Sequence, residues 1–283
     1  MRPWYVIPVL AIASIAAAWL ITHHVPLAIA IGACAAALTA AIRGVLGPSG
    51  VAAVAAAGGG AVGMLGALAL HVTIRDAIGG AAAMFSIYEL ARDKQVTESP
   101  LPAAGAAVLA GVIDPSYAGL VCVAGIAWLR SPGSKPRGAI ALPVIGAIAA
   151  LVAISCALTS PHSSLYVHWL GRTPAHRDIA NTLLRTGDVV GAMPAFAALV
   201  GLVSCILRDR VSGFAVGAIV GITAITSLAG GFVSPAAPLV AGLGTGVAIG
   251  RLAMLVRLPV GQQFVGATCG FVLVVAPAWT LIA

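Results

Sequence analysis

A single ionisable side chain interrupts a long apolar stretch of this sequence. Asp114 lies in "GVIDPSYAGLVCV" (111–123), within a run from Leu101 to Leu129 that has no other charged residue. A charge in the centre of a bilayer costs about 3 kcal/mol on insertion scales, so such groups usually face a water-filled path or a partner. Pro115 removes one helical hydrogen bond beside it. We expect a kinked helix with Asp114 on a solute or ion pathway; the alternative is a capped acid that stabilises the kink.

Three further charged residues are candidates for the same pathway. Arg75, Asp76 and Glu89 lie in the segment 73–100, "TIRDAIGGAAAMFSIYELARDKQVTESP". The adjacent Arg75 and Asp76 cannot face the same way on a helix, so each is expected to meet another segment.

A second cluster of charge could bind an anion. Arg172, Arg177 and Arg185 lie in the polar segment 159–187, and guanidinium groups bind phosphate, carboxylate or lipid headgroups through paired hydrogen bonds. Thr173 and Pro174 are typical of a helix start and Gly187 of a stop, which predicts a short amphipathic helix over 174–186. The alternative is an interfacial helix whose arginines lie among headgroups.

Neither a metal site nor a cofactor is predicted. His162, His168 and His176 are six and eight residues apart, unlike the i, i+4 pair of a helical zinc site. The cysteines have no C-x-x-C spacing, and small buried side chains are the expected role; they are Cys34, Cys122, Cys156, Cys205 and Cys269.

Composition defines the class of protein that must position these residues. Hydrophobic residues make up 60% of the chain and charged residues 8%, with a mean hydropathy of +1.07, whereas soluble domains average about 25% charged residues. We therefore expect one all-α domain over 1–283, a polytopic helical bundle in a bacterial-type inner membrane. The net charge of +7 mainly sets orientation in such a protein, so nucleic acid is not an expected partner. The expected partners are the lipid bilayer, a small solute or ion, and further copies or membrane-complex subunits.

About nine apolar stretches are long enough to cross roughly 30 Å of hydrocarbon. They are 5–22, 25–42, 50–72, 101–129, 138–158, 188–207, 212–232, 236–256 and 263–283. The apolar part of 73–100, Ala77 to Leu90, would reach only about 21 Å as a helix. We predict that 73–100 and 159–187 form two interfacial or re-entrant elements.

The basic residues favour a cytoplasmic N-terminus. In this orientation the inner side has Arg2, Arg43, Arg130, Lys135, Arg137, Arg208, Arg210, Arg251 and Arg257, and the outer side has Arg75, Arg92, Lys94, Arg172, Arg177 and Arg185. An excess of Lys and Arg marks cytoplasmic loops, and the excess here is modest.

Regularly spaced glycines predict close helix packing. "GGGAVGMLG" (58–66) has Gly59 and Gly63 on one face, and "GLGTGVAIG" (242–250) has Gly242, Gly246 and Gly250 at four-residue spacing. Small residues at such spacing let helix backbones approach in lipid.

The stretch "LLRTGDVVGAMPAFAALVG", around Gly187-Asp188, resembles the Gly-x-Gly-Asp span of intramembrane aspartyl proteases of the prepilin-peptidase and presenilin type. An aspartate upstream, Asp114, and a later proline-containing stretch, "SPAAPLVAG" (234–242), follow the order of that family, although Arg185 stands at the motif's first glycine. The resemblance implies that Asp114 and Asp188 share a proton and activate water for peptide hydrolysis.

The leading hypothesis is a protein that transports or conducts a small solute or ion past Asp114. Two alternatives stay open. One is an intramembrane enzyme, either the aspartyl protease or a transferase that uses a lipid-linked substrate, and the other is a structural subunit of a larger membrane complex.

Overall fold

The described part of the chain is all-helical. The computed structural model describes residues 6–92, 101–114, 117–130, 188–208, 213, 215–221, 223 and 234–282, and these residues form helices and turns with no strand among them. The predicted span 138–158, the segment 159–187 with its helix 174–186, and the arginines Arg172, Arg177 and Arg185 lie outside the described residues.

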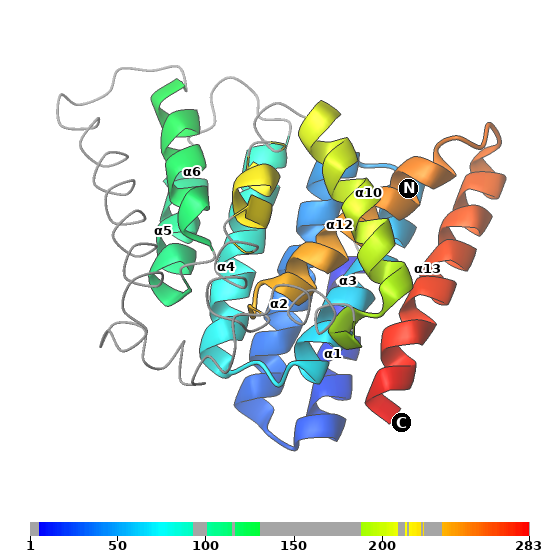
Figure 1. Cartoon of the computed structure of the whole chain (residues 1–283), viewed down its shortest axis with the longest axis horizontal. Helices are drawn as coiled ribbons and strands as arrows, with labels where there is room; N and C mark the ends of the chain where they lie inside the picture. Colours follow the sequence, from blue (N-terminus) through cyan, green and yellow to red (C-terminus); the bar gives the residue numbers. More distant parts are fainter. Residues whose placement is uncertain are drawn as a thin grey trace.

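Three helices run back and forth from the N-terminus: α1 (Val6–Thr22), α2 (Val25–Leu46) and α3 (Gly50–Ala69) (Figure 1). The turn between α2 and α3 uses Gly47, whose φ of 84° is a conformation that glycine adopts without strain. Ser49 then caps α3, because its Oγ accepts a hydrogen bond from the N–H of Ala52 at 3.1 Å. Polar turn chemistry therefore fixes the ends of two very apolar helices.

The polar segment after α3 forms α4 (Ile74–Ala91), which begins with a capping box. Thr73 Oγ1 accepts a hydrogen bond from the N–H of Asp76 (3.2 Å), and Asp76 Oδ2 accepts one from the N–H of Thr73 (2.9 Å). Gly80 faces Cys34 on α2, and Gly44 near the end of α2 faces the last turn of α4. The whole length of α4 thus lies along α2 and runs in the same direction.

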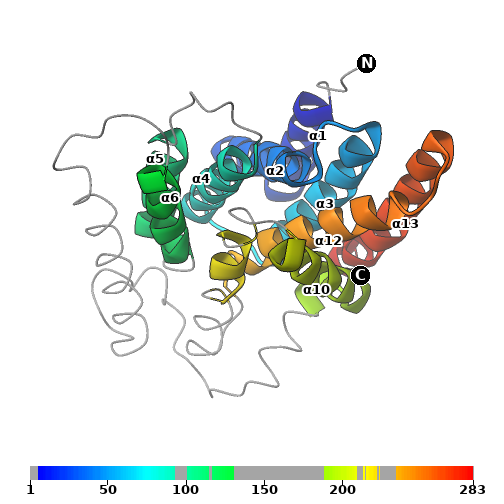
Figure 2. The same cartoon turned by 90° about the horizontal axis from the view of Figure 1, so that it is seen from above.

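The run from 101 to 129 is two helices instead of one kinked helix. α5 (Leu101–Ile113) ends before Asp114, and α6 (Ala118–Arg130) packs against α5, so that the chain turns back on itself (Figures 1 and 2). Ser86 Oγ on α4 donates a hydrogen bond to the carbonyl of Ala103 at 2.9 Å. The α5–α6 hairpin therefore packs on α4, and the chain reverses between Asp114 and Tyr117.

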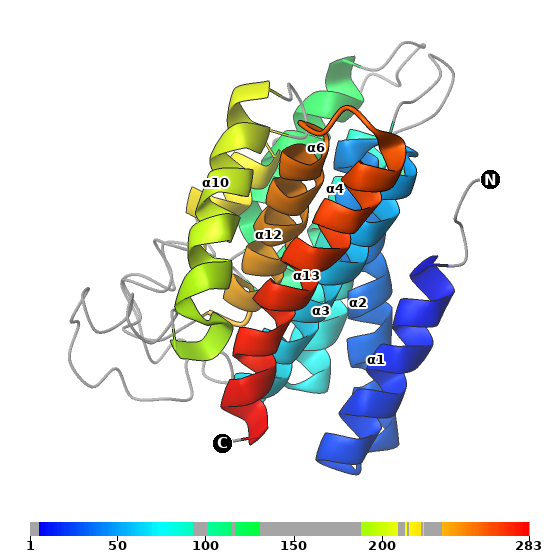
Figure 3. The ribbon, with the colours of Figure 1, turned by 90° about the vertical axis from the view of Figure 1, so that its right-hand side faces the viewer.

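Three further helices are α10 (Ala192–Arg208), α12 (Ala237–Ala253) and α13 (Pro259–Ile282), and residues 188–190 and 215–221 are helical as well. α12 is the central element and packs against α2, α3, α10 and α13 (Figures 2 and 3). It runs antiparallel to α3, since its first turn at Pro238 faces Gly66 and its later residue Gly246 faces Ala55.

Glycines allow α12 and α3 to touch through their backbones. A Cβ atom added to Gly59 would lie 2.5 Å from the carbonyl oxygen of Gly242 and 2.7 Å from Cα of Gly246, while one added to Gly242 would lie 2.8 Å from Cα of Gly63. Gly250 instead makes room for the side chain of Leu46 on α2. Close contact through small residues is the packing mode of helices in lipid.

Two of the described helices, α2 and α3, are long and apolar enough to cross a membrane, judged by length and composition. Five shorter apolar helical stretches of 10–17 residues accompany them in the described part of the chain: Ile7–Thr22, Leu101–Ile113, Ala192–Leu207, Ala237–Ala253 and Pro259–Val275. Nine crossings therefore stay a prediction, while the all-helical architecture is confirmed.

Candidate functional site

The two described residues at the tip of the α5–α6 hairpin are buried inside the bundle. Asp114 is 0% exposed and Tyr117 is 1% exposed. The N–H of Asp114 donates to the carbonyl of Ala110 (2.9 Å), and the N–H of Tyr117 donates to the carbonyl of Asp114 (3.0 Å). These backbone hydrogen bonds close a tight turn around the tip and satisfy polar groups that burial would otherwise leave unpaired.

The Tyr117 phenol reaches across to α2 and α12 over a glycine of α4. A Cβ atom on Gly80 would lie 3.4 Å from Tyr117 Oη and 3.1 Å from Cys34 Sγ, and it would also clash with the side chain of Leu239. The absence of a side chain at Gly80 therefore lets a phenol, a thiol and the first turn of α12 converge.

Two carboxylates belong to the same neighbourhood. Asp114 is bonded to Tyr117 through the backbone at 3.0 Å, and Asp76 lines one cavity with Cys34, whose thiol lies near the Tyr117 hydroxyl at Gly80. Among the described residues, Tyr117 Oη has no hydrogen-bond partner, and a buried hydroxyl without one costs about 1–3 kcal/mol. We call Cys34, Asp76, Asp114 and Tyr117, together with the first turn of α12, the tip site.

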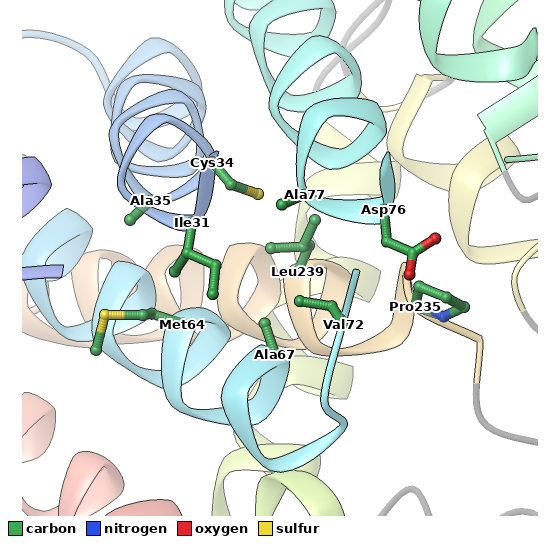
Figure 4. A pocket seen from close by; sticks show the side chains of 10 residues that line it. All are labelled: Ile31, Cys34, Ala35, Met64, Ala67, Val72, Asp76, Ala77, Pro235 and Leu239. Carbon is green, nitrogen blue, oxygen red and sulfur yellow. The ribbon is translucent and has the colours of Figure 1, made fainter. Parts of the chain in front are cut away.

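A small cavity adjoins the tip site between α2, α3, α4 and α12. It leaves about 10 Å³ for the centre of a water-sized sphere, which is close to the minimum for one water molecule. Figure 4 shows the Asp76 carboxylate beside Pro235 and the Cys34 thiol directed toward Ala77. The cavity therefore has polar groups on two sides and an apolar lining elsewhere.

The start of α12 is also buried. Ser234 is 0% exposed, and its Oγ accepts a hydrogen bond from the N–H of Ala236 at 3.3 Å. Pro238 lies in the first turn, where a residue without an N–H leaves one donor fewer to satisfy. The positive end of a helix dipole thus lies near the Asp76 side chain.

The tip site can bind a small polar or charged species. Two carboxylates and a phenol oxygen can accept hydrogen bonds or contact a cation, and the start of α12 supplies a partial positive charge. Within the described part of the chain, no group of three or more His, Cys, Asp or Glu residues could hold a metal ion.

The structure separates the other predicted pathway residues from the tip site. Arg75 is exposed at the start of α4. Glu89 is 7% exposed and pairs with Arg92 at 3.5 Å. It is 13 residues beyond Asp76 on the same helix, or about 20 Å away. Of the four predicted pathway residues, only Asp114 and Asp76 share a neighbourhood.

The structure does not bring Asp114 and Asp188 together. Asp188 is exposed, and the nearby Val190 packs with Val62 and Ala198 in a cluster of α3 and α10. Figures 1 and 2 show α10 well apart from the α5–α6 hairpin. Two aspartates that share a proton must lie within hydrogen-bond distance, so this arrangement does not support a catalytic dyad.

Sequence reasoning overlooked two members of the tip site. Tyr117 follows Asp114 by three residues in an apolar run, which was a usable signal for a second polar group at the same turn. Cys34 had no local signal, because only the packing of α2 on α4 brings it to Gly80.

Comparison with protein-family models, with curated proteins and with solved structures finds no match to this chain. The functional interpretation therefore depends on the tip site and on the distribution of apolar and basic residues over the bundle.

Proposed function

We propose that this chain is a multi-pass membrane protein that transports or conducts a small solute or ion, and that the tip site is the polar element of its pathway. The observation that carries the proposal is the α5–α6 hairpin, whose reversal places the fully buried Asp114 next to Tyr117, while the Tyr117 hydroxyl approaches Gly80 of α4 together with Leu239 of α12. Non-helical backbone at membrane depth is tolerated only where protein buries it or where it lines a cavity. Broken helices that end inside the protein are typical of transporter binding sites; the tip of the hairpin faces Gly79, which is five residues, or about 8 Å, from the start of α4.

The outer surface of the bundle supports a lipid environment. Large apolar side chains are exposed along the outer faces of α10 and α13; they include Met193, Phe196, Leu199 and Leu207 on α10, and Val260, Phe264 and Phe271 on α13. Soluble monomers rarely expose contiguous apolar patches of more than a few hundred Å², and hydrocarbon would cover these faces without cost.

The arginines support an orientation with the N-terminus in the cytoplasm of a bacterial-type cell. Among the described residues, one end of the bundle has Arg43, Arg92, Arg130, Arg208, Arg251 and Arg257, and the opposite end has Arg75. An excess of arginine marks the cytoplasmic side. α1 begins toward the arginine-rich end, because it runs antiparallel to α2.

This orientation revises two expectations from the sequence. Because α4 lies along α2, we propose that α4 crosses the membrane with it, instead of lying in the interface. Arg92 then belongs to the cytoplasmic side, whereas hydropathy had assigned it to the outer side. The α5–α6 hairpin enters from the cytoplasmic side and returns to it.

In this proposal each group of the tip site has a role in binding. Asp114 supplies the negative charge that a cation, a proton or a hydrogen-bond donor of the solute would meet. Asp76 and the Tyr117 hydroxyl supply further oxygen atoms, and Gly80 leaves the space in which they meet. The water-sized cavity beside Asp76 admits one small species unless the helices move.

The test is charge movement in proteoliposomes, with Asp188→Asn as the matched control for Asp114→Asn. Currents are recorded on a solid-supported membrane after jumps in proton, sodium or methylammonium concentration. We expect one of these jumps to give a current above that of protein-free liposomes, at least tenfold smaller in Asp114→Asn and unchanged in Asp188→Asn.

Size-exclusion profiles and thermal stability show whether both variants are folded. Equal currents in folded Asp114→Asn and in the native chain contradict the assignment of the pathway. The absence of current in the native chain for all three ions contradicts an ion pathway.

A further inference from the structure

One polar group of the tip site lacks a hydrogen-bond partner. Tyr117 is 1% exposed, and its hydroxyl makes no hydrogen bond to any of the described residues. A phenolic hydroxyl can both donate and accept a hydrogen bond, and most buried polar atoms are paired with protein or with an ordered water molecule. The Tyr117 hydroxyl therefore requires a partner that the described helices do not supply.

We propose that a single water molecule binds beside the Tyr117 hydroxyl, and that the species moved through the tip site is a proton, which this water relays. The inference rests on the transport function proposed above and names its substrate class. It depends on three side chains that the packing of α2, α4 and the α5–α6 hairpin brings together: Cys34, Asp76 and Tyr117.

The packing places a thiol and a phenol around one point of α4. A Cβ atom on Gly80 would lie 3.1 Å from Cys34 Sγ and 3.4 Å from Tyr117 Oη, so both polar atoms border the space that a side chain would fill there. Cys34 and Leu239, which adjoin Gly80, also line the water-sized cavity between α2, α3, α4 and α12. The Tyr117 hydroxyl therefore lies next to two walls of that cavity.

Asp76 adds a carboxylate one helical turn away. It lines the cavity (Figure 4). It is four residues before Gly80 on α4, so the two positions share a helix face and are about 6 Å apart. Both hydrogen bonds that Asp76 accepts from Thr73 end on Oδ2, at 2.9 and 2.8 Å, which leaves Oδ1 as an acceptor. One water molecule with two hydrogen bonds of about 2.8 Å each spans a gap of this size.

The size of the cavity limits what can bind. It leaves about 10 Å³ for the centre of a water-sized sphere, which is close to the space that one water molecule needs. A buried water has two to four polar partners, and Tyr117 Oη, Cys34 Sγ and Asp76 Oδ1 are three candidates. An organic solute is too large for this space.

The lining of the cavity disfavours a metal cation. Among the described residues that line it, Asp76 alone has an oxygen atom in its side chain. A calcium ion takes about six to eight oxygen ligands, and a monovalent cation needs oxygen atoms in place of its hydration shell. A proton needs only a chain of groups that donate and accept hydrogen bonds, and intramembrane carboxylates form such chains in pumps and transporters.

The relay leaves the water and the phenol unchanged. Asp76 is half-buried in the first turn of α4, where it can take a proton from the solvent at that end of the bundle. Its Oδ1 passes this proton to the water, and the water passes one of its own to Tyr117 Oη. The phenol then releases its hydroxyl proton toward Asp114, which we assign as the acceptor. One proton has moved from Asp76 to Asp114.

The first experiment measures the thermal stability of the full chain in an uncharged detergent. Tyr117→Phe removes one oxygen atom and keeps the ring. Tyr88→Phe is the matched control, because Tyr88 lies eight residues, or about 12 Å, beyond Gly80 on α4. If water binds the hydroxyl, Tyr117→Phe breaks a hydrogen bond and lowers Tm by about 2 °C or more relative to the control. If the site is dry, the substitution removes an unpaired polar group and Tm is unchanged or higher, which overturns the proposal.

The second experiment uses the proteoliposome currents described above. We expect a current after a proton jump and none after a sodium or methylammonium jump. The proton current should be at least fivefold smaller in Tyr117→Phe and unchanged in Tyr88→Phe, with size-exclusion profiles to show that both variants are folded. Equal proton currents in folded Tyr117→Phe and in the native chain overturn the relay.

The outcomes separate this inference from the function on which it rests. A sodium or methylammonium current that is lost in Asp114→Asn supports the transport function and overturns the proton relay. The absence of every current contradicts both. A proton current that is lost in Asp114→Asn and in Tyr117→Phe, together with a lower Tm of Tyr117→Phe, supports both.

Discussion

Replacing Gly59 with alanine should force apart the two helices at the centre of the bundle. The added Cβ atom would lie 2.5 Å from the carbonyl oxygen of Gly242, and 2.7 Å from both Cα of Gly246 and Cδ1 of Ile42. Carbon atoms pack at about 3.5–4.0 Å, so α12 must move away from α3 by about 1 Å. Two of the three obstructing atoms are backbone, so rotation of a side chain cannot relieve the clash.

The size of the effect follows from two opposing terms. Overpacking of a core costs about 1–3 kcal/mol, and the upper end applies here because a rigid helix must move. Alanine is favoured over glycine inside a helix by about 0.5–1 kcal/mol. The expected net loss is about 2 kcal/mol, or a decrease in Tm of about 4–8 °C at about 2–4 °C per kcal/mol.

The matched control is Gly105→Ala in α5, where an added Cβ atom has no neighbour within 4 Å. This variant has the same gain in helix propensity and no clash, so its Tm should equal or slightly exceed that of the native chain. Thermal unfolding in detergent, followed by size-exclusion chromatography of the heated samples, gives both values. A Gly59→Ala variant as stable as Gly105→Ala would refute the backbone contact between α3 and α12.

Three further predictions test other parts of the bundle. Thr245→Val should lower the unfolding free energy by about 1–3 kcal/mol, because Thr245 Oγ1 donates to a buried carbonyl of α10 at 3.1 Å; Thr245→Ser should restore most of it in thermal unfolding. Thr73→Ala should cost about 1 kcal/mol through loss of the α4 cap, and an equal loss in Thr73→Ser would contradict this cause. In a cysteine-free background, cysteines at Leu101 and Arg130 should react with an impermeant maleimide from the same side of sealed vesicles, and a cysteine at Arg75 from the other side. Labelling of the Leu101 and Arg130 positions from opposite sides would contradict the hairpin.

The apolar helices could be located from the sequence to within a few residues. The stretches 25–42, 50–72 and 236–256 correspond to α2, α3 and α12. An apolar run of this length has few alternatives to a helix, because every backbone polar group must be satisfied internally. The ends were less accurate, since α2 continues past Arg43 to Leu46, where hydropathy alone had ended the helix.

The role of α4 could not be obtained from hydropathy. The apolar stretch from Ala77 to Leu90 is too short to cross a bilayer, and the charges at its ends made an interfacial position reasonable. The structure adds a capping box at Thr73, which begins the helix earlier, and a close contact along α2 at Gly44 and Gly80. The capping signal was present in the sequence, whereas the contact depends on a different helix.

The tip site was predictable in part. Asp114 was recognisable as a lone carboxylate next to a proline, and Asp76 as a charge that needed a partner. The sequence could not distinguish a kink from a reversal, because 101–113 and 118–130 are both apolar and each fits either arrangement. Packing on α4 selects the reversal over the kink. Ser86 of α4 donates a hydrogen bond to the Ala103 carbonyl, and Gly79 of α4 leaves room for Ile113.

The reversal at Asp114 links the buried site to the distribution of charge. If 101–130 crossed the bundle as one kinked helix, Arg130 would emerge at the end opposite Arg92, and the basic residues would be divided between the two ends. Because the hairpin returns, both arginines lie at the same end as Arg43. The same turn leaves Asp114 buried inside the bundle. Tyr117 follows it in the turn, and the absence of a side chain at Gly80 leaves space for the Tyr117 phenol. A chain that needed only a stable crossing could have apolar residues in place of the Asp-Pro pair, and this is the reason why we propose that a ligand reaches the buried turn.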